Sequence, residues 1–239
     1  EGATCKKLHP ARAAVNGLTA AVLAKGGMTG PERILDARDG GLYRAVADSF
    51  DMKILVKGLG TGYEILKIDK KPYPCCRTTH HAIDGALMLR DRADPEQVER
   101  ILVETYEVGV LQCGSQGYPS SAVEAKFSIP YTVAAALVRG NVSLAEFAPE
   151  VIGDPLIQSL ADRVQVTADP LFTGRYPDRW GCRVRLIDKD GSELAVQVDD
   201  MSGSVAKPLT EEQEKRKFEG LAGEGIGAER SRKLLRTIK

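Results

Sequence analysis

Apolar residues recur at helical spacing in the first part of the chain. Between Pro10 and Lys25, Val15, Leu18 and Val22 are three and four positions apart, and Leu23 adjoins the same face. This pattern predicts an amphipathic helix. Because the stretch is rich in alanine, whose small side chain lets helices approach one another, the helix is expected to pack closely on its neighbours.

Glycine and proline then divide the helical portion. A glycine pair at 26–27 is expected to end the first helix. Thr29 or Gly30, just before Pro31, can begin another helix with the proline in its first turn. The helix-rich portion is predicted to continue to about Phe50.

An extended segment, a helix and a strand are predicted next. Residues 57–78 are rich in glycine, lysine and proline, which favour turns and extended backbone. Thr78 or Thr79 can then cap a helix that runs to about Arg92. Residues 98–108 carry β-branched side chains and alternate in polarity, which is typical of a strand.

The following hundred residues alternate between helical and strand patterns. Residues 122–140 predict a second long helix, in which Pro130 must lie near the start or cause a kink. Residues 141–162 are expected to form short helices. Strands are predicted over 163–169 and twice within 182–200, where the turn Lys-Asp-Gly makes the later pair a hairpin.

Helical patterns return at the end of the chain. Thr210 and the acidic residues after it predict a capped helix, and a basic helix follows. This order predicts an α+β protein in which a mostly helical domain is interrupted by an inserted two-layer α+β domain. The expected divisions are 1–66 for the helical part, 67–204 for the inserted domain and 205–239 for helices that rejoin the helical domain.

Charge and cysteine content narrow the class of protein. Lys plus Arg and Asp plus Glu both number 33, so the sequence predicts no general attraction to nucleic acid or to an anionic membrane. No apolar run approaches the roughly 20 residues that span a bilayer, and the first residues lack the apolar core of a signal peptide. A cytoplasmic protein is expected. The 5 cysteines are scattered and lack CxxC spacing, which argues against a disulfide framework or a structural zinc site and favours reduced thiols.

The stretch KKPYPCCRTTHH at 70–81 concentrates side chains that do chemistry. Lys71 and Arg77 could hold carboxylates while His80 or a cysteine transfers a proton, which would suit a polycarboxylic acid. A metal site is a weaker interpretation, because adjacent cysteines point different ways in extended chain. The alternative is structural, with the cysteines buried as small hydrophobic residues.

Two further clusters are candidates for the same site. Lys6 and His9 flank the start of the first predicted helix, where backbone amides favour an anion such as a carboxylate. Lys126, Ser128 and Tyr131 lie within two helical turns, and Tyr131 could donate a proton or bind a substrate oxygen. Each cluster has a structural alternative: solvated lysines and a packing histidine in the first, a packing tyrosine in the second.

In this order the clusters resemble the MmgE/PrpD family, which includes 2-methylcitrate dehydratase, cis-aconitate decarboxylase and iminodisuccinate epimerase. The resemblance covers essentially the whole chain. It is carried by GATCKKLHPARAAVNGLTAAVLAKGGMTGPERIL, KPYPCCRTTHHAID, EAKFSIPYTVAAAL and KPLTEEQEKRKF. It implies a helical domain with an inserted α+β domain, an active site between them, a homodimer, and no metal or organic cofactor.

The resemblance also implies roles for individual residues. Lys6 falls on the lysine before the Leu-His pair and Lys71 on that of the KxYPxC segment. His80 falls on the histidine after the Cys-Arg pair, and Tyr131 on an active-site tyrosine. At the position of Cys76 decarboxylase-like members may carry a histidine, so the reaction type stays open; Cys76 is expected to line the pocket.

The match lacks the upstream part of the family's helical domain, which normally supplies further catalytic histidines. The chain therefore resembles the C-terminal half of the enzyme. Alone, its helical domain would expose a large apolar face, which soluble monomers rarely tolerate. A second polypeptide carrying the N-terminal half is therefore expected. Many members also have a glycine after the Leu-His pair, where this chain continues with Pro10 and Ala11.

The leading functional hypothesis is a cofactor-free lyase that removes water from a 2-methylcitrate-like hydroxy acid. Lys6, Lys71 and Arg77 would bind carboxylates, while His80 and Tyr131 would transfer protons or orient the substrate. An isomerase or epimerase, or a decarboxylase of the same family, is the near alternative. A non-catalytic half or subunit that needs a partner chain is the alternative of another class.

Overall fold

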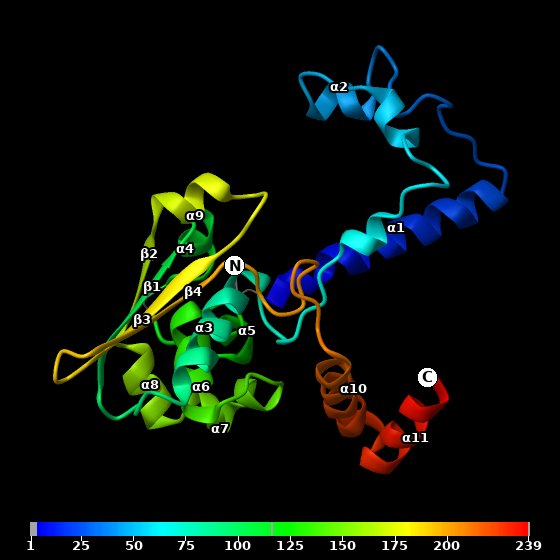
Figure 1. The fold of residues 1–239 in the computed structure, drawn as a ribbon. Coiled ribbons are helices and arrows are strands. Elements are labelled where there is room, and N and C mark those ends of the chain that lie inside the picture. The colour runs from blue at the N-terminus through cyan, green and yellow to red at the C-terminus, as the bar shows by residue number, and fades with distance from the viewer. Residues whose placement is uncertain (1–3, 116, 239) are drawn as a thin grey trace. The chain divides into compact units, whose positions relative to one another are not determined.

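The computed structural model describes residues 4–115 and 117–238, which form two compact units, 4–67 and 68–238 (Figure 1). The smaller unit is helical. It contains η1 (Thr4–Lys7), α1 (Leu8–Lys25), α2 (Leu42–Val46), η2 (Met52–Val56) and η3 (Glu64–Lys67). The first predicted helix is thus confirmed as α1, and it ends at the glycine pair.

Two expectations for this unit are wrong. No helix begins at Pro31: residues 32–36 form turns, in which the amide of Ala37 donates to the Arg33 carbonyl at 2.9 Å without a helix continuing. Nor does α1 pack closely, because all of its side chains are exposed, including Leu18 at 70% and Val22 at 62%. Within residues 5–67 only Gly41 is buried, so the described unit has no apolar core of its own.

The larger unit is built on a four-stranded sheet. Its strands are β1 (Val98–Thr105), β2 (Val164–Ala168), β3 (Cys182–Asp188) and β4 (Glu193–Val198), in the order β2-β1-β3-β4. β1 runs parallel to β2 and antiparallel to β3, and β3 and β4 form the predicted hairpin. Val103 lies opposite Val166 on one side and Val184 on the other, so apolar side chains share one face of the sheet.

Two helices cover the buried face of this sheet. α3 (His80–Arg90) packs against β3 and β4, while α6 (Ile129–Arg139) packs against α3, α8 (Pro155–Ala161) and β2 (Figure 1). Gly85 permits the close approach of α3, because a Cβ atom there would lie 2.6 Å from Cγ2 of Val184. The predicted α+β class is confirmed, whereas insertion of this part into a helical domain stays a prediction.

Short helices connect these elements and change some predicted boundaries. They are α4 (Glu107–Cys113), α5 (Ala122–Ala125), η5 (Ala145–Phe147), α7 (Pro149–Ile152) and α9 (Pro170–Arg175). The strand expected over 98–108 stops at Thr105, because α4 begins two residues later. The long helix expected over 122–140 is two helices, since Ser128 starts α6 as its N-cap and Pro130 occupies the first turn.

The C-terminal helices are α10 (Glu211–Ile226) and α11 (Ala228–Ile238). The side chain of Thr210 accepts from the Gln213 amide at 3.2 Å, and Gln213 accepts from the Thr210 amide at 2.9 Å, which completes a capping box and confirms the predicted start. Both helices belong to the larger unit. Among the described residues, no helix combines the length and apolar character that crossing a membrane requires.

Candidate active site

The segment that carries Lys71 is held on both sides. Before it, the Lys70 amide donates to the Gly203 carbonyl at 2.7 Å. After it, the Cys76 amide donates to the Lys126 carbonyl at 2.8 Å, just before η4 (Arg77–Thr79) leads into α3. Prolines at 72 and 74 restrict the backbone between these two anchors. Lys71 therefore projects from a short, tethered loop.

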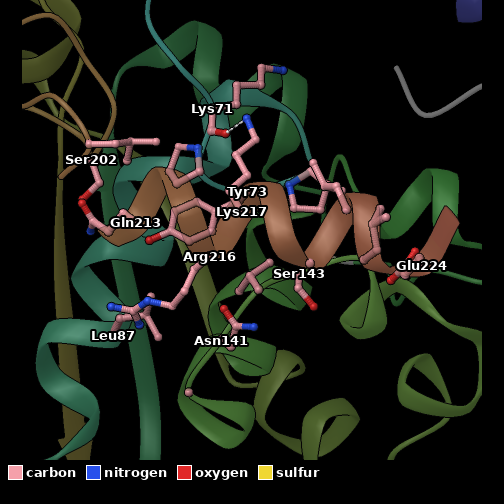
Figure 2. A pocket seen from close by; sticks show the side chains of 18 residues that line it. Lys71, Tyr73, Leu87, Asn141, Ser143, Ser202, Gln213, Arg216, Lys217 and Glu224 are labelled. Carbon is pink, nitrogen blue, oxygen red and sulfur yellow. Dashed lines mark hydrogen bonds between the residues drawn. The ribbon is translucent and has the colours of Figure 1, made fainter. Parts of the chain in front are cut away.

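A cavity of about 880 Å³ lies beside this loop, between it and α10 (Figure 2). Three cationic residues line it: Lys71, Arg216 and Lys217. The ammonium of Lys217 donates to the Lys71 carbonyl at 2.7 Å, and this contact ties α10 to the loop. Glu224 is the single acidic residue among the lining residues. In Figure 2 it lies at the far end of the visible part of α10, away from Arg216. The cavity is therefore biased toward anions.

Hydrogen-bonding side chains complete the lining: Tyr73, Asn141, Ser143, Ser202 and Gln213. Two of its walls are joined by a buried carboxylate, because Asp84 accepts from the Tyr73 hydroxyl at 2.5 Å and from the Ser202 amide at 2.6 Å. Burial and the charge of Asp84 raise the pKa of Tyr73, so its phenol stays protonated. Polar groups and cations together suit a small molecule with several carboxylates.

Arg77 lines a different cavity. That cavity has a volume of about 210 Å³ and shares no lining residue with the larger one. Here the Arg77 guanidinium forms an ion pair with Asp69 and lies 4.0 Å from the centre of the Trp180 ring. Asp199 and Asp200 also face this cavity, so its lining is more acidic than basic. The structure does not bring Arg77 together with Lys71.

His80 is fully buried and lines neither cavity. Its ring meets that of Tyr73 edge-on, with centroids 5.2 Å apart. Neither ring nitrogen makes a well-aligned hydrogen bond with a described residue, although the Cys75 carbonyl favours the protonated ring. Burial, followed by the charge of Lys71, lowers the pKa of His80 to about 3. His80 is neutral near pH 7 and lies behind Tyr73.

The cluster around Tyr131 is also buried in this structure. The Tyr131 hydroxyl donates to the Glu146 carbonyl, and its ring packs near Tyr118 and Phe147. The Ser128 hydroxyl accepts from the Tyr131 amide at 3.1 Å as the N-cap of α6, and the Lys126 ammonium lies 5.4 Å from the centre of the Phe147 ring. These contacts are structural, and none of Lys126, Ser128 and Tyr131 lines either cavity.

The expectation that Cys76 lines the pocket is wrong, because it lines neither cavity. Cys76 is half-buried just before η4, and its pKa differs from that of its neighbour Cys75. A hydrogen bond from Cys113 is the largest cause that lowers the pKa of Cys76, to about 5; burial opposes it, while Thr78 and the charge of Lys71 assist. Burial instead raises the pKa of Cys75 to about 12. Cys76 is therefore a thiolate at neutral pH, whereas Cys75 is a thiol.

The remaining predicted residues belong to the smaller unit. Lys6 lies in η1 and His9 in α1, and both are exposed. Their place in the site stays a prediction. Across residues 4–115 and 117–238, no three or more His, Cys, Asp or Glu side chains are grouped as metal ligands would be.

The sequence reasoning missed Arg216 and Lys217. The signal for them is helical periodicity. Cavity-lining residues recur every four positions along α10 in two adjacent rows, which are Gln213, Lys217 and Leu221, and Arg216, Gly220 and Glu224. These rows form one face of α10. The sequence identifies that face, but only the tertiary structure shows that it lies opposite Lys71.

Comparison with known proteins identifies the family. The family model described as MmgE/PrpD C-terminal domain matches residues 73–239, and the model of the MmgE/PrpD N-terminal domain matches residues 1–55. The chain belongs to the MmgE/PrpD family. The resemblance first seen in the sequence motifs is thereby confirmed.

The curated relatives are enzymes that act on small polycarboxylates. Cis-aconitate decarboxylase of Mus musculus is 26% identical over 243 residues, which are 98% of this chain and 49% of the relative. The Homo sapiens enzyme of that name is 25% identical with the same coverage. The 2-methylcitrate dehydratase of Salmonella typhimurium is 24% identical over 165 residues, 66% of this chain and 34% of the relative. The chain thus spans about half the length of the first two relatives.

Proposed function

We propose that this MmgE/PrpD chain forms part of a cofactor-free lyase that removes water from a 2-methylcitrate-like hydroxy acid. The observation that carries the proposal is the cavity of about 880 Å³ lined by Lys71, Arg216 and Lys217. Three cations on one cavity match the several carboxylates of such an acid. The names of the relatives, a decarboxylase and a dehydratase of small polycarboxylates, support the same substrate class.

In this proposal the cations bind carboxylates and stabilise the charge that develops on the substrate. Removal of a proton beside a carboxylate leaves negative charge on the substrate, which fixed cations oppose at low cost because they need not reorganise. The Lys71 ammonium is also able to protonate the departing hydroxyl group. The loop is anchored at Gly203 and Lys126, and this ammonium donates to the Cys75 carbonyl at 3.1 Å.

The proposal assigns the base to Cys76 in preference to the predicted His80 and Tyr131. None of these three lines the cavity of about 880 Å³; among them, Cys76 alone is both ionised at neutral pH and half-buried. His80 is fully buried, and the Tyr131 hydroxyl already donates to a backbone carbonyl. His80 instead supports Tyr73, and Tyr131 supports α6.

Decarboxylation of an aconitate-like acid is the second candidate. The extent of the sequence match favours it, since the cis-aconitate decarboxylases of Mus musculus and Homo sapiens align with 98% of this chain. Against it stands Cys76, at a position where family members differ and where the resemblance allows decarboxylase-like members a histidine. An epimerase would need no leaving group at all. The three reactions differ in their products, so product analysis separates them.

Product analysis by proton NMR tests the proposal. The protein, purified with any chain that accompanies it, is incubated with 2-methylcitrate, cis-aconitate or iminodisuccinate. We expect 2-methylcitrate to be consumed and an unsaturated product that keeps all of its carboxylates to appear. Loss of a carboxylate from cis-aconitate would instead identify a decarboxylase. Turnover of none of the acids would contradict the enzyme hypothesis and favour a non-catalytic subunit.

We further propose that a second chain, carrying the N-terminal half of the helical domain, packs on α1, and that the complete unit dimerises. The support is the exposed row of Val15, Leu18 and Val22 on a unit that lacks a core, together with relatives of twice the length. Exposed apolar faces of this kind usually mark an interface.

Substitution on α1 tests this interface. Leu18→Glu is expected to abolish co-purification of the second chain, because a charge would enter an apolar contact. Ala24→Glu, on the opposite side of α1 from Val15, provides the matched control and should leave co-purification largely intact. Mass spectrometry and sedimentation measure both. A wild-type chain that purifies alone as a stable monomer would contradict the partner proposal.

A further inference from the structure

Cys76 and Cys113 come from different elements that are fastened together. Cys76 precedes η4, and Cys113 is the last residue of α4 and fully buried. Beside them, the Thr78 hydroxyl donates to the Gln112 side-chain oxygen at 3.0 Å, which holds η4 against α4. The Cys76 amide is fixed from the other side by the Lys126 carbonyl at 2.8 Å. The backbone around both sulfur atoms is thus held in place.

The two thiols are joined by a hydrogen bond in which Cys113 stabilises the Cys76 thiolate. Cys76 is half-buried, whereas Cys113 has no exposed surface. A partly exposed thiolate beside an enclosed thiol is the usual arrangement of a reactive cysteine with its resolving partner. No disulfide joins any of the 5 cysteines, all of which lie among the described residues.

The other cysteines lack one of these features. Cys75 is buried, and its sulfur lies 3.1 Å from the Thr79 hydroxyl. Cys182 is buried in β3, and burial raises its pKa. Cys5 is exposed but belongs to the smaller unit. Cys75 is the informative comparison, because it is next to Cys76 in the sequence yet stays a thiol.

We propose that Cys76 and Cys113 are a peroxide-sensitive thiol pair that closes into an intramolecular disulfide. In the first step the Cys76 thiolate attacks one oxygen of a hydroperoxide. The O–O bond breaks, an S–O bond forms, and the departing hydroxide or alkoxide takes a proton from water. Sulfur is oxidised to the sulfenic acid, and the peroxide is reduced.

In the second step Cys113 displaces the hydroxyl group of the sulfenic acid. Its thiol loses a proton, the S–S bond forms, the S–O bond breaks, and the hydroxyl leaves as water. The two sulfurs must approach to about 2.05 Å. Cys113 ends α4 and Cys76 precedes η4, so neither sulfur lies within the middle of a helix. A dithiol reductant reverses the change, because its thiolate attacks the disulfide and itself ends oxidised.

Peptide mapping after treatment with hydrogen peroxide at about pH 7 tests the pair. In the wild-type protein we expect a Cys76–Cys113 cross-link and the loss of two hydrogen atoms from the intact mass, both reversed by dithiothreitol. Cys113→Ser should give no cross-link and should instead gain oxygen at Cys76. Cys75→Ser, the matched control, should cross-link as the wild type does.

The pH dependence of alkylation provides a second measurement that a merely structural role for Cys113 would not change. The rate of iodoacetamide labelling at Cys76 should rise through a midpoint near pH 5 in the wild type, because the thiolate forms above that pH. The midpoint should move upward in Cys113→Ala, since that substitution removes the donor to the Cys76 thiolate. The midpoint is decisive rather than the rate, because a less basic thiolate is also less nucleophilic.

The outcomes separate this inference from the proposed lyase activity. A Cys75–Cys76 bond, or Cys76 oxidised beyond the sulfenic acid while Cys113 stays reduced, would overturn the pair. The cross-link needs no substrate, so it can be present in a protein that turns over none of the acids. If the lyase proposal holds, cross-linked protein should also lose most of its turnover and regain it on reduction.

Discussion

Lys71→Ala is expected to lower kcat/KM for the polycarboxylate substrate by roughly 10²–10³-fold in the complete active protein. The substitution removes a positive charge from the rim of the cavity, where the substrate becomes more negative as the reaction proceeds. It also removes the donor to the Cys75 carbonyl at 3.1 Å, which helps to shape the loop. Steady-state rates measured by loss of substrate in proton NMR provide the test.

The neighbouring lysine supplies a matched control. Lys70 forms an ion pair with Glu214 at 2.5 Å, and both side chains are largely exposed, at 66% and 44%. Exposed pairs contribute little to stability, and Lys70 does not line the cavity. We expect Lys70→Ala to change kcat/KM by no more than about twofold. Equal losses in the two variants would show that general surface charge, and not Lys71 itself, is responsible.

The elements that the sequence predicted well depend on local signals. The capping box at Thr210 and the Lys-Asp-Gly turn between β3 and β4 involve residues a few positions apart, so the sequence contains the whole signal. Pro31 is different. A proline can start a helix but does not stabilise one, and few apolar contacts cover the turns that follow. The short helices α4 and α9 were missed because segments this short do not form stable helices in isolation, so their sequences carry little helical signal.

The candidate site was only partly predictable for a related reason. The chemistry around Lys71 and Cys76 stands out because unusual residue types gather within one short stretch. Ser128 was assigned to substrate binding although serine before a helix start is equally the pattern of an N-cap, which is its observed role. Arg216 and Lys217 face Lys71 only through tertiary packing, across more than 140 residues of sequence.

Gly203→Ala is expected to lower the free energy of unfolding by roughly 3 kcal/mol. Gly203 has a φ of +84°, and a Cβ atom there would overlap the carbonyl oxygen of Lys70. The backbone would have to move, which breaks the 2.7 Å bond from the Lys70 amide and the 2.8 Å bond from the Gly203 amide to Lys207. Each such bond contributes about 1 kcal/mol, and the positive φ adds about 1 kcal/mol. Urea denaturation measures the change.

Gly191→Ala separates strain from overlap. Gly191 also has a φ of +84°, in the β3–β4 turn, but no atom lies within 4 Å of a Cβ placed there. Its substitution should therefore cost only the conformational part, about 1 kcal/mol. The difference between the two variants then reports how firmly Gly203 holds the loop that presents Lys71. Equal destabilisation would mean that the loop yields freely, and Lys71 would then owe its position to Lys217 instead.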